Sequence, residues 1–405
     1  MTVMSEADTP AVAARARGVV ALCFAIALLE GFDIQAVGVA APRMIPALNL
    51  GPQQAGLVFG GGMFGLVVGA LLGGWLADRV GRRWLLTGAV VLFGLFTVGT
   101  AMASDFAVLL AVRLMTGLGL GMAMPVLVAI ALEVSHPAKR AQTVTTMFCG
   151  MPVGGALSGL IATVALDAEP LGWRAIFILG GLVPLLLLPW LARLPETRTH
   201  APVATTGVRG ADVLFAEGRL SITLLQWLAF GLTLLVLYLL LNWLPTLVTA
   251  RQLGATTASL SAVSFNLASV AGALFIGRLV DRFGPWRPIG LAYLGLLGAM
   301  IGLTVADQAP LVLFCAGAAG FCLLGAQYSL YGVGPMYYPA AGRGLATGAA
   351  VAVGRLGSIV GPLVAGQLMA TGAGPAGVAA AMAPVVIVAG LAATVMTLKG
   401  RLLPD

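Results

Sequence analysis

Residues 74–83 of this chain read GWLADRVGRR, and residues 277–284 read GRLVDRFG. The two stretches share two glycines and an Asp-Arg pair at the same spacing, and Asp281 lies 203 residues after Asp78. Two further matches occur at this offset, Arg140 with Arg343 and Gly154 with Gly357. The repetition predicts that the chain of 405 residues is an internal duplication of two similar halves.

The composition places both halves in a membrane. Hydrophobic residues make up 60% of the chain and charged residues 9%, with a mean hydropathy of +1.01. A soluble globular chain carries about 25% charged residues. Twelve apolar segments are long enough to cross a bilayer, which takes about 20 residues. They cover residues 18–42, 54–77, 84–103, 107–132, 142–166, 173–192, 222–248, 258–280, 288–306, 311–334, 344–370 and 376–398. The predicted fold class is an all-α polytopic membrane protein with twelve transmembrane helices.

The loops predict the orientation. Basic residues gather in the loops on one side, whereas Arg43, Arg174 and Arg251 fall on the other. Because Lys and Arg mark cytoplasmic loops, we expect a multi-pass protein of the cell (inner) membrane with both termini cytoplasmic. The same loops account for the net charge of +7, so no nucleic-acid partner is implied. The predicted domains are a tail (1–17), a six-helix bundle (18–194), a cytoplasmic linker (195–221), a second six-helix bundle (222–398) and a tail (399–405).

Five ionisable residues lie inside the predicted spans: Glu30, Asp33, Arg113, Glu133 and Arg355. An ionised carboxylate at the bilayer centre costs on the order of 3 kcal/mol on insertion scales, so such acids are protonated, paired or directed into a cavity. Glu30 and Asp33 are three residues apart on one helix and would titrate as a coupled pair. We expect at least one to carry a transported proton and favour Asp33, which is deeper from the cytoplasmic end. The alternative is that one carboxylate only pairs with an arginine to hold helices together.

Several motifs resemble the major facilitator superfamily over the full chain. They are the GWLADRVGRR stretch, RLMTGLG at residues 113–119 and Pro195-Glu196-Thr197 at the end of the sixth span. The resemblance implies two six-helix bundles related by a pseudo-twofold axis along the membrane normal, which transport by alternating access. It also implies that Arg113, at the position of the superfamily's span-four arginine, takes part in proton coupling; a purely structural role is equally open.

Within the superfamily, the chain resembles the aromatic acid:proton symporters. The resemblance rests on the acidic pair in EGFDIQA (30–36), on NWLP (242–245) and on VGRLG (353–357). The first of these looks most like the span-one segment of the 3-(3-hydroxyphenyl)propionate transporters. Most of the family has aspartate where Glu30 stands, which weakens a transfer of benzoate or 4-hydroxybenzoate specificity and favours the phenylpropionate branch, with 3-(3-hydroxyphenyl)propionate or a hydroxybenzoate as the expected kind of substrate.

Arg355 is the predicted anchor for a substrate anion. Glycines at 354 and 357 lie beside it in the eleventh span, and a guanidinium can bind a carboxylate through two hydrogen bonds. Its alternative role is that of an internal partner for Glu30 or Asp33. Both roles fit one mechanism, in which the substrate carboxylate competes with the acids for Arg355.

An aromatic carboxylate also needs apolar walls and polar contacts for its ring substituents. Candidates are Asn242 and Trp243 in the seventh span, Gln327, Tyr328 and Tyr331 in the tenth, and Phe148 in the fifth. We select Asn242, Trp243 and Gln327 as substrate-binding residues.

The repeated loop motif is expected to act as a conformational latch in the outward-open state. Its residues are Asp78, Arg79, Gly81, Arg82 and Arg83, with Asp281 and Arg282 in the second half. Glu133 is expected to pair with Arg79 or Arg82. Residues 150–155, GMPVGG, predict close helix packing and a bend.

The predicted function is uptake of an aromatic carboxylate in symport with protons. No cofactor, metal site or catalytic cluster is predicted, so the chain is not expected to be an enzyme. The proton is the predicted coupling ion. The protein is expected to be a monomer in the lipid bilayer. The four cysteines form no CxxC pattern. A proton-coupled drug or organic-anion antiporter of the same fold is the alternative.

Overall fold

The computed structural model describes residues 10–135, 140–166, 168, 170–194, 210–216, 218–339 and 342–400. Over these ranges the regular structure is helical throughout, without strands. Twelve helices in this part of the chain are long and apolar enough to cross a membrane. The chain is therefore a multi-pass membrane protein of the predicted fold class.

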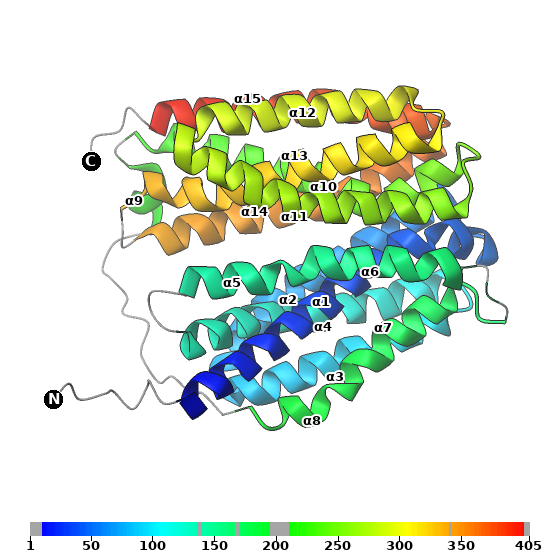
Figure 1. The fold of residues 1–405 in the computed structure, drawn as a ribbon, viewed down its shortest axis with the longest axis horizontal. Coiled ribbons are helices and arrows are strands. Elements are labelled where there is room, and N and C mark those ends of the chain that lie inside the picture. Colours follow the sequence, from blue (N-terminus) through cyan, green and yellow to red (C-terminus); the bar gives the residue numbers. More distant parts are fainter. Residues whose placement is uncertain are drawn as a thin grey trace.

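The first half contains eight helices in the described ranges. They are α1 (Pro10–Ala47), α2 (Pro52–Val80), α3 (Arg82–Ala101), α4 (Phe106–Val134), α5 (Arg140–Phe148), α6 (Gly150–Ala165), α7 (Arg174–Leu186) and α8 (Leu188–Leu191). The second half follows as a separate layer (Figure 1). It contains α9 (Gly210–Phe215), α10 (Leu220–Thr249), α11 (Ala255–Phe283), α12 (Trp286–Val305), α13 (Ala309–Val333), the 3-10 helix η3 (Gly334–Tyr337), α14 (Arg343–Ala370) and α15 (Gly374–Lys399). The start of α1 and the end of α15 lie at the same end of the molecule (Figure 1).

The duplication predicted from the sequence is visible in the packing. A Cβ atom added to Gly154 would collide with the carbonyl of Leu28, and one added to Gly357 would collide with the carbonyl of Gly231. Both residues of the second contact lie 203 positions after those of the first. Two more contacts repeat in this way: Gly117 on Gly62 with Gly320 on Phe265, and Gly69 on Leu118 with Gly272 on Phe321. The two halves therefore bring equivalent helices together through equivalent glycines.

The structure interrupts the fifth span at the segment where a bend was predicted. That span consists of α5 and α6, which are interrupted at Cys149. Pro152 has no N–H group, so the carbonyl of Phe148 loses its helical partner at this point. The glycines of the segment pack as expected, because Gly150 and Gly154 lie against the backbone of α1.

Two predicted boundaries differ from the structure. Helix α1 extends beyond the predicted 18–42 in both directions, and α9 and the start of α10 lie inside the predicted linker, 195–221. Helix α9 is held in place because its residues Val213 and Leu214 pack against Tyr338 and Ala346. Residues 195–209 of the linker and both chain ends, 1–9 and 401–405, lie outside the described residues.

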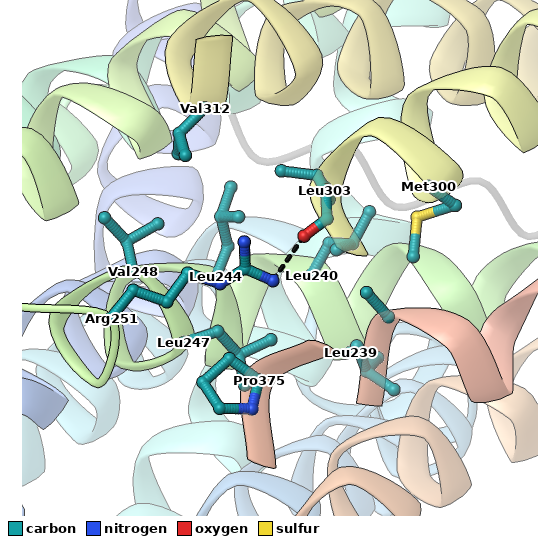
Figure 2. Close-up of a pocket in the computed structure, with 11 residues that line it drawn as sticks. Leu239, Leu240, Leu244, Leu247, Val248, Arg251, Met300, Leu303, Val312 and Pro375 are labelled. Carbon is teal, nitrogen blue, oxygen red and sulfur yellow. Dashed lines mark hydrogen bonds between the residues drawn. The ribbon is translucent and has the colours of Figure 1, made fainter. Parts of the chain in front are cut away.

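Arg251 fills a small hollow between α10, α12 and α15 (Figure 2). Its guanidinium donates hydrogen bonds to the carbonyls of Leu303 and Ala306 at the C-terminal end of α12. The remaining space is about 20 Å³, room for about one water molecule. This hollow is too small for an organic substrate, so the candidate site lies elsewhere.

Candidate functional site

A cavity of about 1880 Å³ lies between the two halves. It reaches from Gln35 and Asn266, near the middle of α1 and α11, to Asp281, Pro285 and Tyr337 at the end where α1 starts and α15 ends. At the opposite end the halves are in contact, through α1 with α10, α2 with α14 and α6 with α11. In the described part of the chain the cavity therefore opens at the end of the latch loops, and its volume exceeds the roughly 300–1,000 Å³ of a ligand pocket.

Arg355 projects into this cavity from α14. Its Nη1 donates a hydrogen bond to the hydroxyl of Tyr238 at 3.0 Å. The carboxylate of Glu30 and the hydroxyl of Tyr331 lie close enough to interact electrostatically with the guanidinium. Because Arg355 is half-buried and faces open space, it retains N–H groups for an anion.

Tyr238 was not among the predicted site residues. Its hydroxyl accepts a hydrogen bond from Arg355, so its own hydrogen is free to be donated to a second acceptor in the cavity. The repeat could have pointed to it, because Tyr238 lies 203 residues after the cavity residue Gln35. That signal becomes useful only once Gln35 is known to line the cavity, which the spacing of polar residues in the spans does not show.

Gln327 and two tyrosines of α13 form the adjoining wall. Gln327 is 2% exposed and lines the cavity, as predicted for a substrate contact. The Tyr331 ring packs edge-on against Phe230, with ring centroids 5.0 Å apart. Tyr328 lies on the same wall. The cavity thus combines a cation, hydroxyl groups, an amide and aromatic faces.

Asn242 and Trp243 are placed elsewhere, which corrects the expectation that this part of the seventh span lines the cavity. Asn242 donates to the backbone carbonyl of Tyr238 at 2.8 Å, and α1 covers it at Gly38. Trp243 donates to the carbonyl of Pro362 at 3.0 Å and packs edge-on against Phe59. Both residues lie where the halves meet at the closed end of the molecule.

The acidic pair of α1 has two separate environments. Asp33 is fully buried and receives hydrogen bonds from Arg113, at 3.2 and 3.3 Å, and from Thr97 at 2.7 Å. Glu30 is 1% exposed, and its Oε2 has no hydrogen-bond partner. Asp33 thus has the arginine-paired arrangement that was the predicted alternative, whereas Glu30 is near the charge of Arg355 without a hydrogen bond to it.

Two cavity amides join the halves. The Nε2 of Gln35 donates to Oδ1 of Asn266 at 2.9 Å, and the Nδ2 of Asn266 donates back to Oε1 of Gln35 at 2.6 Å. Gly155 leaves the space that the Gln35 amide occupies. This pair lies at the inner end of the cavity and was not predicted, since nothing in the spacing indicates which amides meet across a duplication.

The latch residues lie around the open end. Gly81, with a φ of 93°, forms the tight turn between α2 and α3, and Gly284 forms the equivalent turn with a φ of 77°. The expected pairing of Glu133 is confirmed, because it forms an ion pair with Arg82.

The other arginines of the latch contact neighbouring aromatic rings, and Arg83 also donates a hydrogen bond to the carbonyl of Leu194 at 3.4 Å. The guanidinium of Arg79 stacks on Trp75, that of Arg83 on Trp84 and that of Arg282 on Phe283. Asp281 lines the mouth of the cavity. The side chain of Asp78 lies outside the described part of the chain. The role of these residues as a latch in the outward-open state stays a prediction, because the present structure is open at the end of the latch loops.

In the described ranges, no group of three His, Cys, Asp or Glu side chains comes together that could hold a metal ion. The cavity at the centre of this duplicated twelve-helix bundle is lined by a guanidinium, tyrosine hydroxyls, amides and aromatic rings, which can bind an organic molecule. Residues 23–337 match the Major Facilitator Superfamily, so the chain belongs to this family and is a membrane transporter rather than an enzyme.

Known proteins similar to this chain agree with that class. The chain is 41% identical to the 3-(3-hydroxy-phenyl)propionate transporter of Escherichia coli K12, over 95% of each chain. It is 33% identical to the 4-hydroxybenzoate transporter PcaK of Pseudomonas aeruginosa, over 94% of this chain and 92% of that one. Among solved structures, an inward-facing bacterial homologue of the human lysosomal transporter Spinster covers 96% of this chain and 97% of its own. Its TM-score is 0.81 at 18% identity, which supports the fold alone.

Proposed function

We propose that this protein carries aromatic carboxylates across the cell (inner) membrane in symport with protons, as a monomer and without a cofactor. The observation that supports this most directly is that Arg355, which lines the central cavity and can bind an anion, has the buried carboxylate of Glu30, which can bind a proton, within electrostatic reach of its guanidinium. Relatives that carry hydroxylated aromatic acids support the choice of substrate class.

Arg355 binds the substrate carboxylate in this proposal. Its guanidinium and the free hydrogen of Tyr238 form adjacent donors for the two carboxylate oxygens. The rings of Tyr328 and Tyr331 provide apolar faces for the substrate ring. Such an arrangement recognises a planar aromatic acid rather than a flexible aliphatic one.

Glu30 carries the proton in this proposal, in place of Asp33. Asp33 already has Arg113 and Thr97 as partners and makes three hydrogen bonds. Among the described residues, the charge of Arg355 is the one that offsets the charge of Glu30, and the substrate carboxylate competes for it. Protonation of Glu30 removes its repulsion of the substrate, so proton and substrate each favour binding of the other.

The cycle follows from rocking of the two halves about this shared site. A protonated Glu30 leaves Arg355 available to the substrate on the outer side. Opening to the cytoplasm releases the proton, and the ionised Glu30 then competes for Arg355 and expels the substrate. One proton with one monoanion makes this cycle electroneutral, driven by the pH gradient at about 1.4 kcal/mol per pH unit.

The experiment is uptake of radiolabelled 3-(3-hydroxyphenyl)propionate into liposomes that contain the purified protein and carry a pH gradient, acidic outside. We expect accumulation in the wild type and none above equilibrium for Glu30→Gln. Exchange of labelled for unlabelled substrate at equal pH should persist in this variant, because exchange needs no net proton release.

Asp105→Asn is the matched control, since Asp105 caps α4 outside the cavity and asparagine can also cap a helix. Wild-type protein that shows no gradient-dependent uptake of any aromatic acid contradicts the function. Full accumulation by Glu30→Gln contradicts the role of Glu30.

A further inference from the structure

The amide of Gln327 is buried without a well-formed hydrogen bond. Neither Nε2 nor Oε1 has a hydrogen-bond partner of good geometry, and the polar group beside the amide is the hydroxyl of Tyr331. The side chain is 2% exposed and lines the cavity. A buried amide without partners is unfavourable and uncommon in folded proteins. The other two cavity amides, those of Gln35 and Asn266, bond to each other. Gln327 is therefore the cavity amide that is available to a ligand.

Gln327 lies close to the proposed anion site. It is one helical turn from Tyr331 on α13, about 5–6 Å along the axis. The hydroxyl of Tyr331 lies beside Gln327 on one side and near Arg355 on the other. A ligand whose carboxylate binds Arg355 therefore has its ring along Tyr331 and its far edge at Gln327.

We propose that Gln327 binds a hydroxyl group on the substrate ring and makes the site selective for hydroxylated aromatic acids over analogues without the hydroxyl. Its Oε1 accepts the phenolic hydrogen, and its Nε2 donates to a hydroxyl oxygen. An analogue without the hydroxyl displaces water and leaves the amide unpaired, which is the physical origin of the selectivity. This proposal rests on the proposed function and specifies its substrate class.

The test compares four ligands, one without a hydroxyl group and three with one, on two forms of the protein. Affinities of 3-phenylpropionate and of its 2-, 3- and 4-hydroxyphenyl analogues are measured for wild-type protein and for Gln327→Leu. We expect the wild type to prefer at least one hydroxylated acid by about tenfold or more, as for one buried hydrogen bond. In Gln327→Leu this preference is lost through weaker binding of the hydroxylated acid, with 3-phenylpropionate bound as before or more tightly.

Gln308→Leu is the matched control, because Gln308 is exposed at the start of α13 and outside the cavity. Thermal stability without ligand gives a second readout. Replacing an unpaired amide with an apolar side chain should leave the melting temperature unchanged or raise it. If Gln327→Leu does not fold, Gln327→Met keeps the length of the side chain and tests the same hydrogen bond.

The outcomes separate this proposal from the function on which it rests. Failure of the wild type to bind any of the four acids contradicts the proposed function itself. Binding of all four with equal affinity, or an unchanged preference in Gln327→Leu and Gln327→Met, overturns the role of Gln327 alone. An equal loss of affinity for every acid also overturns it, because it shows a structural rather than a selective role.

Discussion

At the scale of single residues, two acids three positions apart on α1 are assigned to different tasks by their surroundings. Asp33 points toward α3 and α4, where Arg113 and Thr97 satisfy it. Glu30 lies close enough to Arg355, the cation of the cavity, to interact with it electrostatically. A buried charge pair with good geometry is stable as a pair but strongly unfavourable once one partner is removed. Asp33 therefore contributes to the integrity of the first bundle.

This assignment predicts that Asp33→Asn destabilises the protein by about 3–5 kcal/mol, since Arg113 is left as an unpaired buried charge. The double variant Asp33→Asn with Arg113→Gln should recover much of that stability. Thermal unfolding of the purified variants in detergent measures both effects. A single variant as stable as the wild type would show that the ion pair contributes nothing to the fold.

At the scale of helices, glycines determine which elements approach closely. Gly154 brings α6 against the backbone of α1, where any side chain would collide with the carbonyl of Leu28. This contact positions the helix that carries both acids. Arginines on the predicted outer side have a related structural role: Arg174 donates to the carbonyl of Ala101 at the end of α3, and Arg251 to carbonyls at the end of α12. These two exceptions to the charge pattern of the loops thus stabilise helix C-termini.

The packing predicts that Gly154→Ala lowers stability by about 1–3 kcal/mol, because α1 and α6 must separate to admit the methyl group. Gly74→Ala is the matched control, since no atom lies within 4 Å of the added Cβ at this exposed position of α2. We expect Gly74→Ala to leave stability unchanged or to raise it by up to about 1 kcal/mol. Equal effects of the two changes on thermal unfolding would refute the packing argument.

At the scale of the whole molecule, two pairs of neutral amides join the halves at the closed end. The buried pair Gln35 and Asn266 links α1 to α11, and the exposed pair Gln53 and Gln367 links α2 to α14. A neutral hydrogen bond contributes about 1 kcal/mol net. Contacts of this strength hold the end closed yet allow it to open during transport.

Asn266→Leu should destabilise the closed end, because the Gln35 amide is then buried and unpaired whenever this end is closed. The variant should therefore shift the molecule toward the state in which this end is open and the end of the latch loops is closed. The expected shift is about 1–3 kcal/mol. Spin labels at positions 102 and 305, exposed at the ends of α3 and α12, report it as a longer distance in a cysteine-free background. Gln53→Leu, in the solvent-exposed pair, should shift the distances little, and equal shifts in both variants would contradict a special role for the buried pair.

The sequence by itself determined the membrane setting, the twelve spans, the duplication and the small set of buried charges. These properties follow from local composition, from segment length and from a constant offset, none of which requires knowledge of helix packing. Arg355 and Gln327 could be selected as candidates because polar groups in apolar spans are few and costly.

Only the tertiary structure decided which charges meet and which polar groups reach the cavity. Asp33 pairs with Arg113 rather than Arg355, Tyr238 enters the site, and Trp243 does not. Each outcome depends on the rotation of a helix about its axis and on the contacts between the halves. The apolar surface of a membrane span is nearly uniform around the helix, so its hydrophobic pattern carries little information about either.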